Sequence, residues 1–327
     1  MRHYCTYFDS HYLLRGLTMF RSLCQHDPQF MLWVLCCDAT ALQALQKLDL
    51  PNLRPVALSE VEAFEPRLQQ AKTNRSRVEY FWTLTPIWPL FLLQSQPQIE
   101  SLTYLDADQF FFASPAPIFA EIGDAPISIF SHRYNDADRP MEINGIYNVG
   151  WVGFRRGETA RACLEKWANQ CLAWCYGRTE NGKYGDQKYL DEWLKLYPET
   201  RVVEHSGAGI APWNWMNCEF QKPAHTLLCD GAPLIFFHFH GLRIFNSWLY
   251  DTFYTTRIYG HMPAQTRRWI FNPYIRAMIE TARWARGRGC RLDFGYTPPR
   301  KYIAAYGKRL FLTKLWKRGF IFHPGLQ

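Results

Sequence analysis

The segment SLTYLDADQFFF, residues 101–112, joins an apolar run to a pair of carboxylates and decides the fold that the sequence predicts. Its first five residues are mostly apolar, aromatic or β-branched, as in a buried strand. Asp106 and Asp108 follow directly, so both side chains can turn toward one ligand where the chain leaves the sheet. Carboxylate oxygens are hard donors that suit Mn²⁺ or Mg²⁺. The segment therefore predicts a metal site at the end of a strand.

A second pair of aspartates with the same spacing, Asp136 and Asp138, occurs in HRYNDADRP, residues 132–140. This run is polar throughout, so we interpret it as a solvated loop. The spacing alone is weak evidence, and the preceding apolar strand is what selects Asp106 and Asp108.

Short β-type runs alternate with helical stretches over the first 256 residues, a pattern typical of a sheet with crossover helices. The expected strands are 3–8, 30–37, 102–105, 127–130, 147–154 and 233–239. The expected helices are 12–26, 40–48, 159–176, 186–197 and a stretch at 67–94 that Pro86 and Pro89 interrupt. We therefore expect an α/β domain at 1–256 and a C-terminal extension at 257–327.

The composition excludes several classes of protein. With 48% hydrophobic and 17% aromatic residues the chain is not disordered. No secretory signal or membrane-spanning run is visible. The ten cysteines form no CxxC pair, which favours reduced thiols in a cytosolic protein.

The net charge of +8 is concentrated in the C-terminal extension, which holds 15 Lys or Arg and two acidic residues. Two stretches, 267–288 and 302–322, place bulky apolar residues between these charges. We expect attachment to an anionic membrane surface, at the cytoplasmic face. A basic face whose aromatic residues pack on the main domain is the alternative, and nucleic acid is a less favoured partner because no recognition motif accompanies the charge.

Further motifs follow one another in a characteristic order. They are TYFDSHY (6–12), YLDADQFFF (104–112), YNVGWVGF (147–154), GDQKYLDEW (185–193), PWNWMN (212–217) and FFHFHG (236–241). This ordered set, from about residue 3 to about residue 245, resembles the retaining, metal-dependent sugar-nucleotide transferases of glycosyltransferase family 8. The basic tail is similar to the membrane-attaching tails of bacterial lipopolysaccharide members of that group.

The resemblance implies a GT-A fold, which is a Rossmann-like nucleotide-sugar domain, and a role for each matching residue. Asp106, Asp108 and His238 would bind the metal, and Asp186 and Gln187 would lie beside the reacting carbon of the donor sugar. The remaining expected contacts to the nucleotide, donor sugar or acceptor are Thr6, Asp9, Tyr12, Asn148, Gly150, Asn214 and Gly241.

Two departures from the family pattern affect the donor site. The usual Tyr-x-Arg before the aspartate pair is absent, and Lys72 and Arg75 are the expected substitutes. The usual lysine after the His-Phe-x-Gly stretch is also absent, and Arg243 is the nearest cation for the diphosphate.

The sequence thus predicts a glycosyltransferase that moves a hexose from a nucleotide-diphosphate sugar, with UDP expected, to a glycan or lipid-linked acceptor. A divalent cation would neutralise the departing diphosphate, and Asp186 would stabilise positive charge on the sugar. A nucleotidyltransferase that makes the activated sugar is one alternative, although it would need a Gly-rich phosphate loop near the N-terminus. A catalytically inactive protein that binds membranes or nucleic acid is the other.

Overall fold

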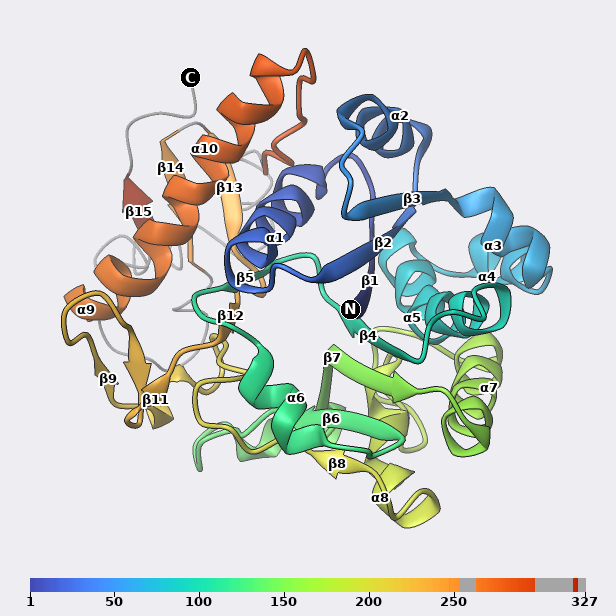
Figure 1. The fold of residues 1–327 in the computed structure, drawn as a ribbon. Coiled ribbons are helices and arrows are strands. Elements are labelled where there is room, and N and C mark those ends of the chain that lie inside the picture. The colour runs from blue at the N-terminus through green and yellow to red at the C-terminus, as the bar shows by residue number, and fades with distance from the viewer. Residues whose placement is uncertain (247, 253–262, 298–319, 323–327) are drawn as a thin grey trace.

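The computed structural model describes residues 1–246, 248–252, 263–297 and 320–322. A mixed sheet of seven strands lies at its centre, in the order β3-β2-β1-β4-β7-β6-β8 (Figure 1). The strands are β1 (Arg2–Phe8), β2 (Phe30–Cys36), β3 (Leu53–Ala57), β4 (Ser101–Leu105), β6 (Ile127–Ser131), β7 (Tyr147–Arg155) and β8 (Arg201–Val202). The first four neighbours run parallel, whereas β7 is antiparallel to both β4 and β6. The predicted α/β class with a mixed sheet is confirmed.

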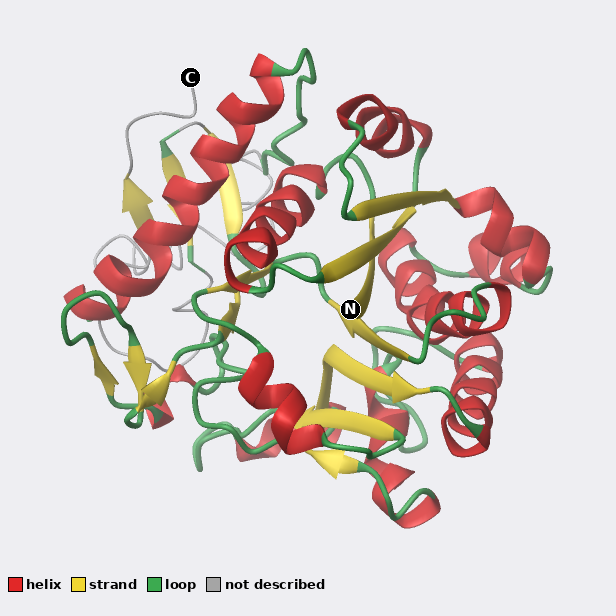
Figure 2. Cartoon of the chain, in the orientation of Figure 1, coloured by secondary structure: helices red, strands yellow, loops and turns green. Residues whose placement is uncertain are grey.

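Helices cover both faces of this sheet, as Figure 2 shows. They are α1 (Leu13–His26), α2 (Ala39–Leu48), α3 (Leu58–Phe64), α4 (Leu68–Asn74), α5 (Arg77–Ser95), α6 (Ala116–Ile122) and α7 (Glu158–Ala173). Successive strand residues face opposite ways, so each strand contributes to two cores. On β1, Tyr4 belongs to the core with α1 and α2, whereas Cys5 belongs to the core with α5 and α7.

The region at 67–94 differs from the expectation of a helix broken at its prolines. Helix α5 continues through Pro86 and Pro89, and Ser76 caps its first turn by accepting a hydrogen bond from the Glu79 amide. Each proline removes one backbone donor from the helix. Burial of side chains such as Leu84 and Trp88 against the sheet maintains the helix despite that loss.

Two other expected elements are shorter than predicted. In place of a helix at 186–197 there is a 3-10 helix, η2 (Gln187–Glu192), followed by the four-residue α8 (Trp193–Leu196). In place of one strand at 233–239 there are β11 (Ala232–Pro233) and β12 (Phe236–His238). β12 pairs antiparallel with β5 (Gln109–Phe111), which begins one residue after Asp108.

The described part of the C-terminal extension packs on the main domain. α10 (Asn272–Gly287) follows α9 (Ala264–Thr266) and the π-helical turn η4 (Arg267–Phe271), and it lies against α1 (Figure 1). Its side chains Tyr274, Ile275 and Met278 are fully buried in the same core as β1 and α1. The expectation that these apolar side chains face a membrane is therefore wrong, because they already have protein neighbours. The expected domain boundary at residue 256 stays a prediction.

A three-stranded sheet also involves the extension. Its strands are β13 (Arg243–Asn246), β14 (Leu249–Asp251) and β15 (Phe320–Phe322). Most of the second basic and aromatic stretch, 302–322, lies outside the described residues. Within the described part, no helix combines the length and the apolar character that crossing a bilayer requires.

Candidate metal and sugar-nucleotide site

Strand pairing brings the three expected metal ligands together. Asp106 and Asp108 follow β4, and the pairing of β5 with β12 places His238 opposite Gln109. Two backbone hydrogen bonds fix this corner, since the Asp106 amide donates to Gly150 O at 2.9 Å and the Phe239 amide donates to Asp108 O at 2.9 Å. The antiparallel pairing therefore determines where the imidazole meets the carboxylates.

The geometry of this group suits a divalent cation. His238 Nε2 lies 3.0 Å from Asp108 Oδ1 and 3.5 Å from Asp106 Oδ2. One donor atom from each of the three residues lies within 4.8 Å of the others. Two carboxylates and one imidazole form a donor set that fits Mn²⁺ or Mg²⁺ in chemical type.

The protonation equilibria of the three side chains are coupled. Burial alone would raise the pKa of Asp108, but the charge and hydrogen bond of His238 outweigh it and lower that pKa to about 2. Burial lowers the pKa of His238, and the two aspartates raise it above its usual value in net effect. The pKa of Asp106 is raised, chiefly by burial. This cluster thus concentrates negative charge in a buried place, which favours a cation there.

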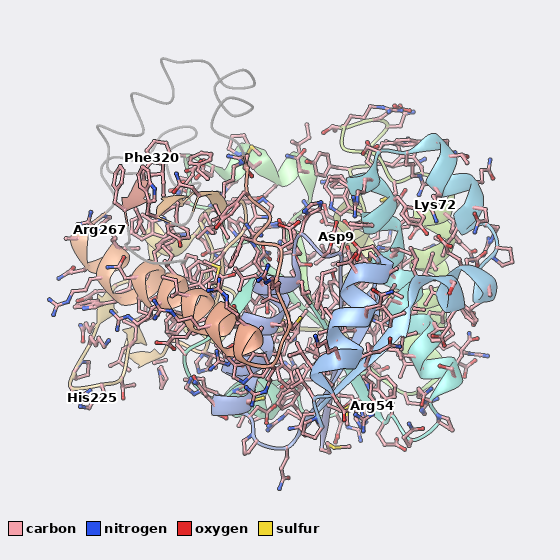
Figure 3. All side chains as sticks on the ribbon, turned by 90° about the horizontal axis from the view of Figure 1, so that it is seen from above. Asp9, Arg54, Lys72, His225, Arg267 and Phe320 are labelled. Atoms are coloured by element: carbon pink, nitrogen blue, oxygen red, sulfur yellow. The ribbon has the colours of Figure 1, made fainter. Side chains whose placement is uncertain are left out.

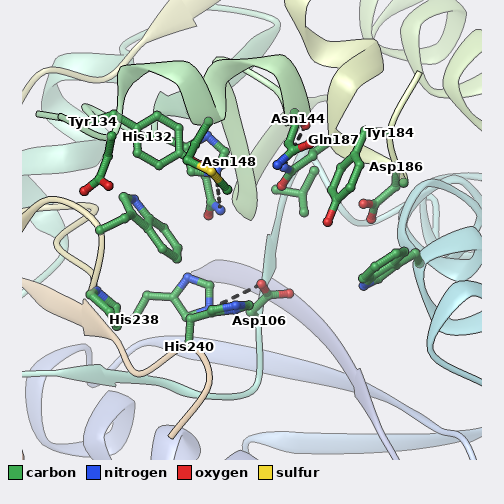
Figure 4. Close-up of a pocket in the computed structure, with 17 residues that line it drawn as sticks. Asp106, His132, Tyr134, Asn144, Asn148, Tyr184, Asp186, Gln187, His238 and His240 are labelled. Carbon is green, nitrogen blue, oxygen red and sulfur yellow. Dashed lines mark hydrogen bonds and ion pairs between the residues drawn. The ribbon is translucent and has the colours of Figure 1, made fainter. Parts of the chain in front are cut away.

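A cavity of about 510 Å³ opens beside the three ligands (Figure 4). Its wall includes Asp106, His238, Asn148, Asp186 and Gln187. Figure 4 shows Asp186 and Gln187 across the pocket from His238, so a bound molecule between them would contact both groups. The cavity is also lined by Trp82, His132, Tyr134, Asp138, Met141, Asn144, Val149, Tyr184, Gly185, Pro212, Trp213 and His240.

Asp186 is more deeply buried than Asp138, the other buried carboxylate of the cavity lining, since 3% of its surface is exposed against 7%. Burial raises its pKa to about 7, although a hydrogen bond with the Thr85 hydroxyl opposes the shift. Its Oδ2 atom has no hydrogen-bond partner among the described residues. The neighbouring Gln187 is held by donation from Nε2 to Asn144 O at 2.8 Å. Asp186 thus has a buried, unpaired oxygen in a residue that lines the cavity.

The expected nucleotide contacts lie around the end of β1. Asp9 is buried and pairs with Arg77, whose guanidinium nitrogen lies 2.7 Å from Asp9 Oδ2. The Tyr12 amide donates to Asp9 Oδ1, while the Tyr12 ring is 41% exposed. The Thr6 hydroxyl is buried without a partner among the described residues. Arg77 lies close behind Lys72 and Arg75, the expected substitutes for the donor-site arginine, and it follows the helix cap Ser76 directly.

Lys72 and Arg75, the expected substitutes for the donor-sugar arginine, are not among the residues that line the cavity, and their role stays a prediction. The Lys72 ammonium lies 2.8 Å from Glu62, at the edge of the molecule (Figure 3). Arg75 donates to Leu172 O at 2.6 Å and to the Thr83 hydroxyl. Both side chains therefore have partners outside the cavity: Lys72 forms an ion pair, and Arg75 donates two hydrogen bonds.

Other expected contacts are structural in this arrangement. The Asn214 side chain accepts from the Ala211 amide and donates to His132 O and Gly209 O, so it holds its own loop. Arg243 pairs with the buried Asp251 at 3.4 Å. Neither residue lines the cavity. Gly241 has a φ of 72°, which favours glycine at the turn after β12.

Asn148 and Gly150 meet as expected beside His238. The Gly150 amide donates to Asn148 Oδ1 at 2.8 Å. A Cβ on Gly150 would lie 2.9 Å from His238 Nδ1, so only glycine leaves room for the imidazole. His132 Nε2 lies 3.2 Å from Asn148 Nδ2 and restrains it from the other side.

The loop that the sequence analysis assigned to solvent contributes to the cavity wall. His132 stacks on Tyr134 at 4.8 Å, and both line the pocket with Asp138. Only Asp136 of the second aspartate pair is exposed, where it pairs with Arg139. Polar composition alone gave no signal for this, because the hydrogen bond from the His132 amide to Ile146 O, which holds the start of the loop beside β7, joins residues far apart in the sequence.

A second group of possible metal donors, Cys218, Cys229 and Asp230, lies at the hairpin of β9 (Phe220–Gln221) and β10 (Leu228–Cys229). Cys229 Sγ donates to Ser206 O at 3.3 Å, and Asp230 Oδ1 accepts from the Glu219 amide at 2.8 Å. These hydrogen bonds give Cys229 and Asp230 a structural role in the hairpin, without a metal ion.

The same fold occurs in the galactosyltransferase LgtC, whose structure was solved in complex with donor and acceptor sugar analogues. The TM-score is 0.53, with 15% sequence identity, and the match covers 88% of this chain and 99% of that chain. The seven-stranded mixed sheet with flanking helices is thus the GT-A glycosyltransferase fold.

Two relatives show the family. YfnF, an uncharacterized protein of Bacillus subtilis (strain 168), is 37% identical over 251 residues, which cover 74% of this chain and 82% of YfnF. YfnD of the same organism, also uncharacterized, is 31% identical over 287 residues, covering 86% of this chain and 89% of YfnD. The chain belongs to the family of YfnF and YfnD. No protein-family model matches the sequence.

The raised pKa of Asp186 predicts a stabilising substitution. An acid whose pKa rises on folding stabilises the protein at low pH, and that stability is lost as pH rises from about 4 to about 7. Asp186→Asn should therefore be more stable than the wild type at pH 8, by on the order of a few kcal/mol, since one pKa unit is worth about 1.4 kcal/mol. Thermal unfolding from pH 4 to pH 8 measures this.

The advantage should become small near pH 4, where the carboxyl is protonated in the folded state and, with an ordinary pKa of 3.8, partly protonated in the unfolded state. Asp136→Asn, at an exposed position, is the matched control and should show no such trend. A stability difference for Asp186→Asn that is the same at pH 4 and pH 8 would contradict the assignment.

Proposed function

We propose that the protein is a metal-dependent glycosyltransferase that moves a sugar from a nucleoside-diphosphate donor, with UDP expected, to a glycan or lipid-linked acceptor. The observation that carries the proposal is one cavity lined by Asp106 and His238 of the three-ligand group and, across from them, by the buried carboxylate of Asp186. The likeness to LgtC, which was solved with donor and acceptor sugar analogues, supports the same reading.

The proposed roles follow from charge. Asp106, Asp108 and His238 would hold a divalent cation, which when bound neutralises the charge that develops on the departing diphosphate. A leaving group stabilised in this way needs no strong general acid. Asp186 lines the cavity with a buried carboxylate, which in its ionised form would stabilise positive charge on the sugar carbon.

The remaining cavity residues orient the two substrates. Gln187 is fixed by Asn144 and lies next to Asp186, in a position to contact the donor sugar or the incoming hydroxyl. Trp213 packs its ring edge against His238 at 5.4 Å and lines the same pocket, so it can stack on a sugar ring. Transfer of a hexose with retention at the anomeric carbon is part of the proposal, because the motif order resembles glycosyltransferase family 8.

Binding of the nucleotide tests the proposal directly. We expect one of UDP, GDP, CDP and ADP to raise the melting temperature in the presence of Mn²⁺ and to have little effect without it. A ligand at 100 times its dissociation constant adds about 2.7 kcal/mol to stability. Asp108→Asn should abolish the metal-dependent shift, because it removes a carboxylate ligand.

Asp136→Asn is the control for this experiment, since Asp136 belongs to the other aspartate pair and pairs with Arg139. It should retain the full shift. No shift with any of the four nucleotides, or an unchanged shift in Asp108→Asn, would argue against a metal-dependent transferase.

We further propose that the exposed face of α10 attaches the protein to an anionic membrane surface at its cytoplasmic side. Arg268, Arg276 and Arg286 are exposed along η4 and α10, while the apolar side chains of α10 are buried. Attachment would then be electrostatic, with about 1 kcal/mol for each basic residue near the surface.

Charge reversal tests this attachment without disturbing the core. The double variant Arg276→Glu/Arg286→Glu should bind vesicles of anionic lipid roughly 30-fold less tightly or weaker still in a flotation assay, since two basic residues contribute about 2 kcal/mol together. Arg161→Glu/Arg201→Glu, at exposed positions on α7 and β8, is the matched control and should float as the wild type does. Equal flotation of both double variants would contradict the proposed face.

A further inference from the structure

The cavity has a second end, opposite Asp186, whose wall comes from the loop at 132–140. Figure 4 shows His132 and Tyr134 at that end. The rings of these two residues stack, with centroids 4.8 Å apart and planes inclined by 8°. The Trp213 ring meets the His132 ring edge to face, with centroids 5.2 Å apart. The three side chains all line the cavity, and their mutual contacts fix an aromatic wall there.

Asp138 belongs to the same loop and lines the same cavity. It is 7% exposed, although its neighbours Ala137 and Arg139 are exposed. Two hydrogen bonds hold it, from the Asp138 amide to Asn135 Oδ1 at 2.9 Å and from Asn135 Nδ2 to Asp138 Oδ2 at 3.1 Å. No other described residue donates to its carboxylate or forms an ion pair with it, since the guanidinium of Arg139 pairs with Asp136. Asp138 Oδ1 is therefore left for a ligand.

The charge of the cavity wall is negative. Asp106, Asp138 and Asp186 line the cavity, whereas its wall contains no lysine or arginine among the described residues. Burial lowers the pKa of His132 to about 3, so this imidazole is uncharged near pH 7. Under the proposed function Asp106 binds the divalent cation, and Asp138 is then the charged group of the aromatic end. A ligand that brings a negative charge to this end would be repelled.

We propose that the aromatic end of the cavity binds the acceptor sugar, that this sugar is neutral or carries an amino group, and that Asp138 selects it. The inference rests on the proposed function, in which the donor sugar lies between the metal group and Asp186 and the aromatic end receives the second substrate. A sugar ring presents an apolar face that can pack on Tyr134 and Trp213.

The selection follows from the chemistry of a carboxylate. An ionised carboxylate only accepts hydrogen bonds, and those that it accepts are stronger than bonds between neutral groups. A hydroxyl or an ammonium group can donate to Asp138 Oδ1. An acidic sugar would instead bring a second carboxylate against Asp138, so the same side chain attracts one class of acceptor and rejects the other.

Three methyl glycosides with one ring and different substituents test the selection. They are methyl β-D-glucosaminide, methyl β-D-glucoside and methyl β-D-glucuronide. Each is titrated into the full chain with Mg²⁺ and the nucleoside diphosphate that raises the melting temperature, and ligand-observed NMR gives the dissociation constant. The first two should bind, and the glucuronide should bind roughly tenfold less tightly or weaker still, because it loses a hydrogen bond to a charged group.

Asp138→Asn removes the charge and keeps an oxygen that can accept from Asn135 Nδ2. It should reduce the preference for the glucosaminide over the glucuronide by roughly tenfold or more, since the repulsion and the charge-assisted bond both disappear. The rise in melting temperature with nucleotide should persist, which shows that the variant is folded. Asp136→Asn in the same loop is the matched control, because Asp136 is exposed, and it should keep the full preference.

The outcomes separate this inference from the function beneath it. Equal binding of the glucuronide and the glucosaminide by the wild type, or an unchanged preference in Asp138→Asn, overturns the selection by Asp138 and leaves the transferase proposal standing. A protein that binds a nucleotide but none of the three glycosides overturns the acceptor assignment of the aromatic end. A protein that binds none of UDP, GDP, CDP and ADP contradicts the proposed function itself.

Discussion

The antiparallel pairing of β5 with β12 is the constraint on which the site depends. It brings His238 from late in the chain to Asp106 and Asp108, which follow β4 directly. Gly150 on β7 leaves the space that the imidazole needs, and the hydrogen bond from the Asp106 amide to Gly150 O ties β7 to the same corner. Four separate segments therefore have to be in register before the three donor atoms can meet, and the seven-stranded sheet supplies that register.

Burying several carboxylates near one another costs free energy of folding, and in this protein such carboxylates lie in and around the cavity. Asp108 is compensated by His238, and Asp9 by Arg77. Asp186 Oδ2 has no hydrogen-bond partner among the described residues, and burial raises the pKa of this carboxyl to about 7. A buried carboxylate with a raised pKa and an unpaired oxygen is typical of sites in which a bound ligand supplies the favourable charge. A cation at one end and a sugar that develops positive charge at the other would relieve both parts of this electrostatic imbalance.

Local pattern predicted some features well because their causes are local. Alternation located β1, β2 and β4, and the apolar strand before them selected Asp106 and Asp108 as candidate metal donors, whereas His238 came from the resemblance to glycosyltransferase family 8. The features that the sequence did not indicate depend on contacts between residues that are far apart in the chain. Arg77, at the start of α5, reaches Asp9 at the end of β1, and His132 is held at the cavity by a hydrogen bond from its amide to Ile146 O, just before β7. Lys72 pairs with Glu62, and Arg75 donates to the backbone oxygen of Leu172. The apolar residues of α10 are buried against α1. Sequence spacing cannot reveal which neighbour a long side chain will find.

The central claim is that one divalent cation bound by Asp106, Asp108 and His238 serves a nucleotide in the adjoining cavity. Crystals grown with Mn²⁺ and UDP, measured at the manganese absorption edge, test it most directly. We predict one anomalous peak within coordination distance of these three side chains and of the diphosphate oxygens. UDP bound elsewhere, or in the cavity with no manganese between the three side chains, would contradict it.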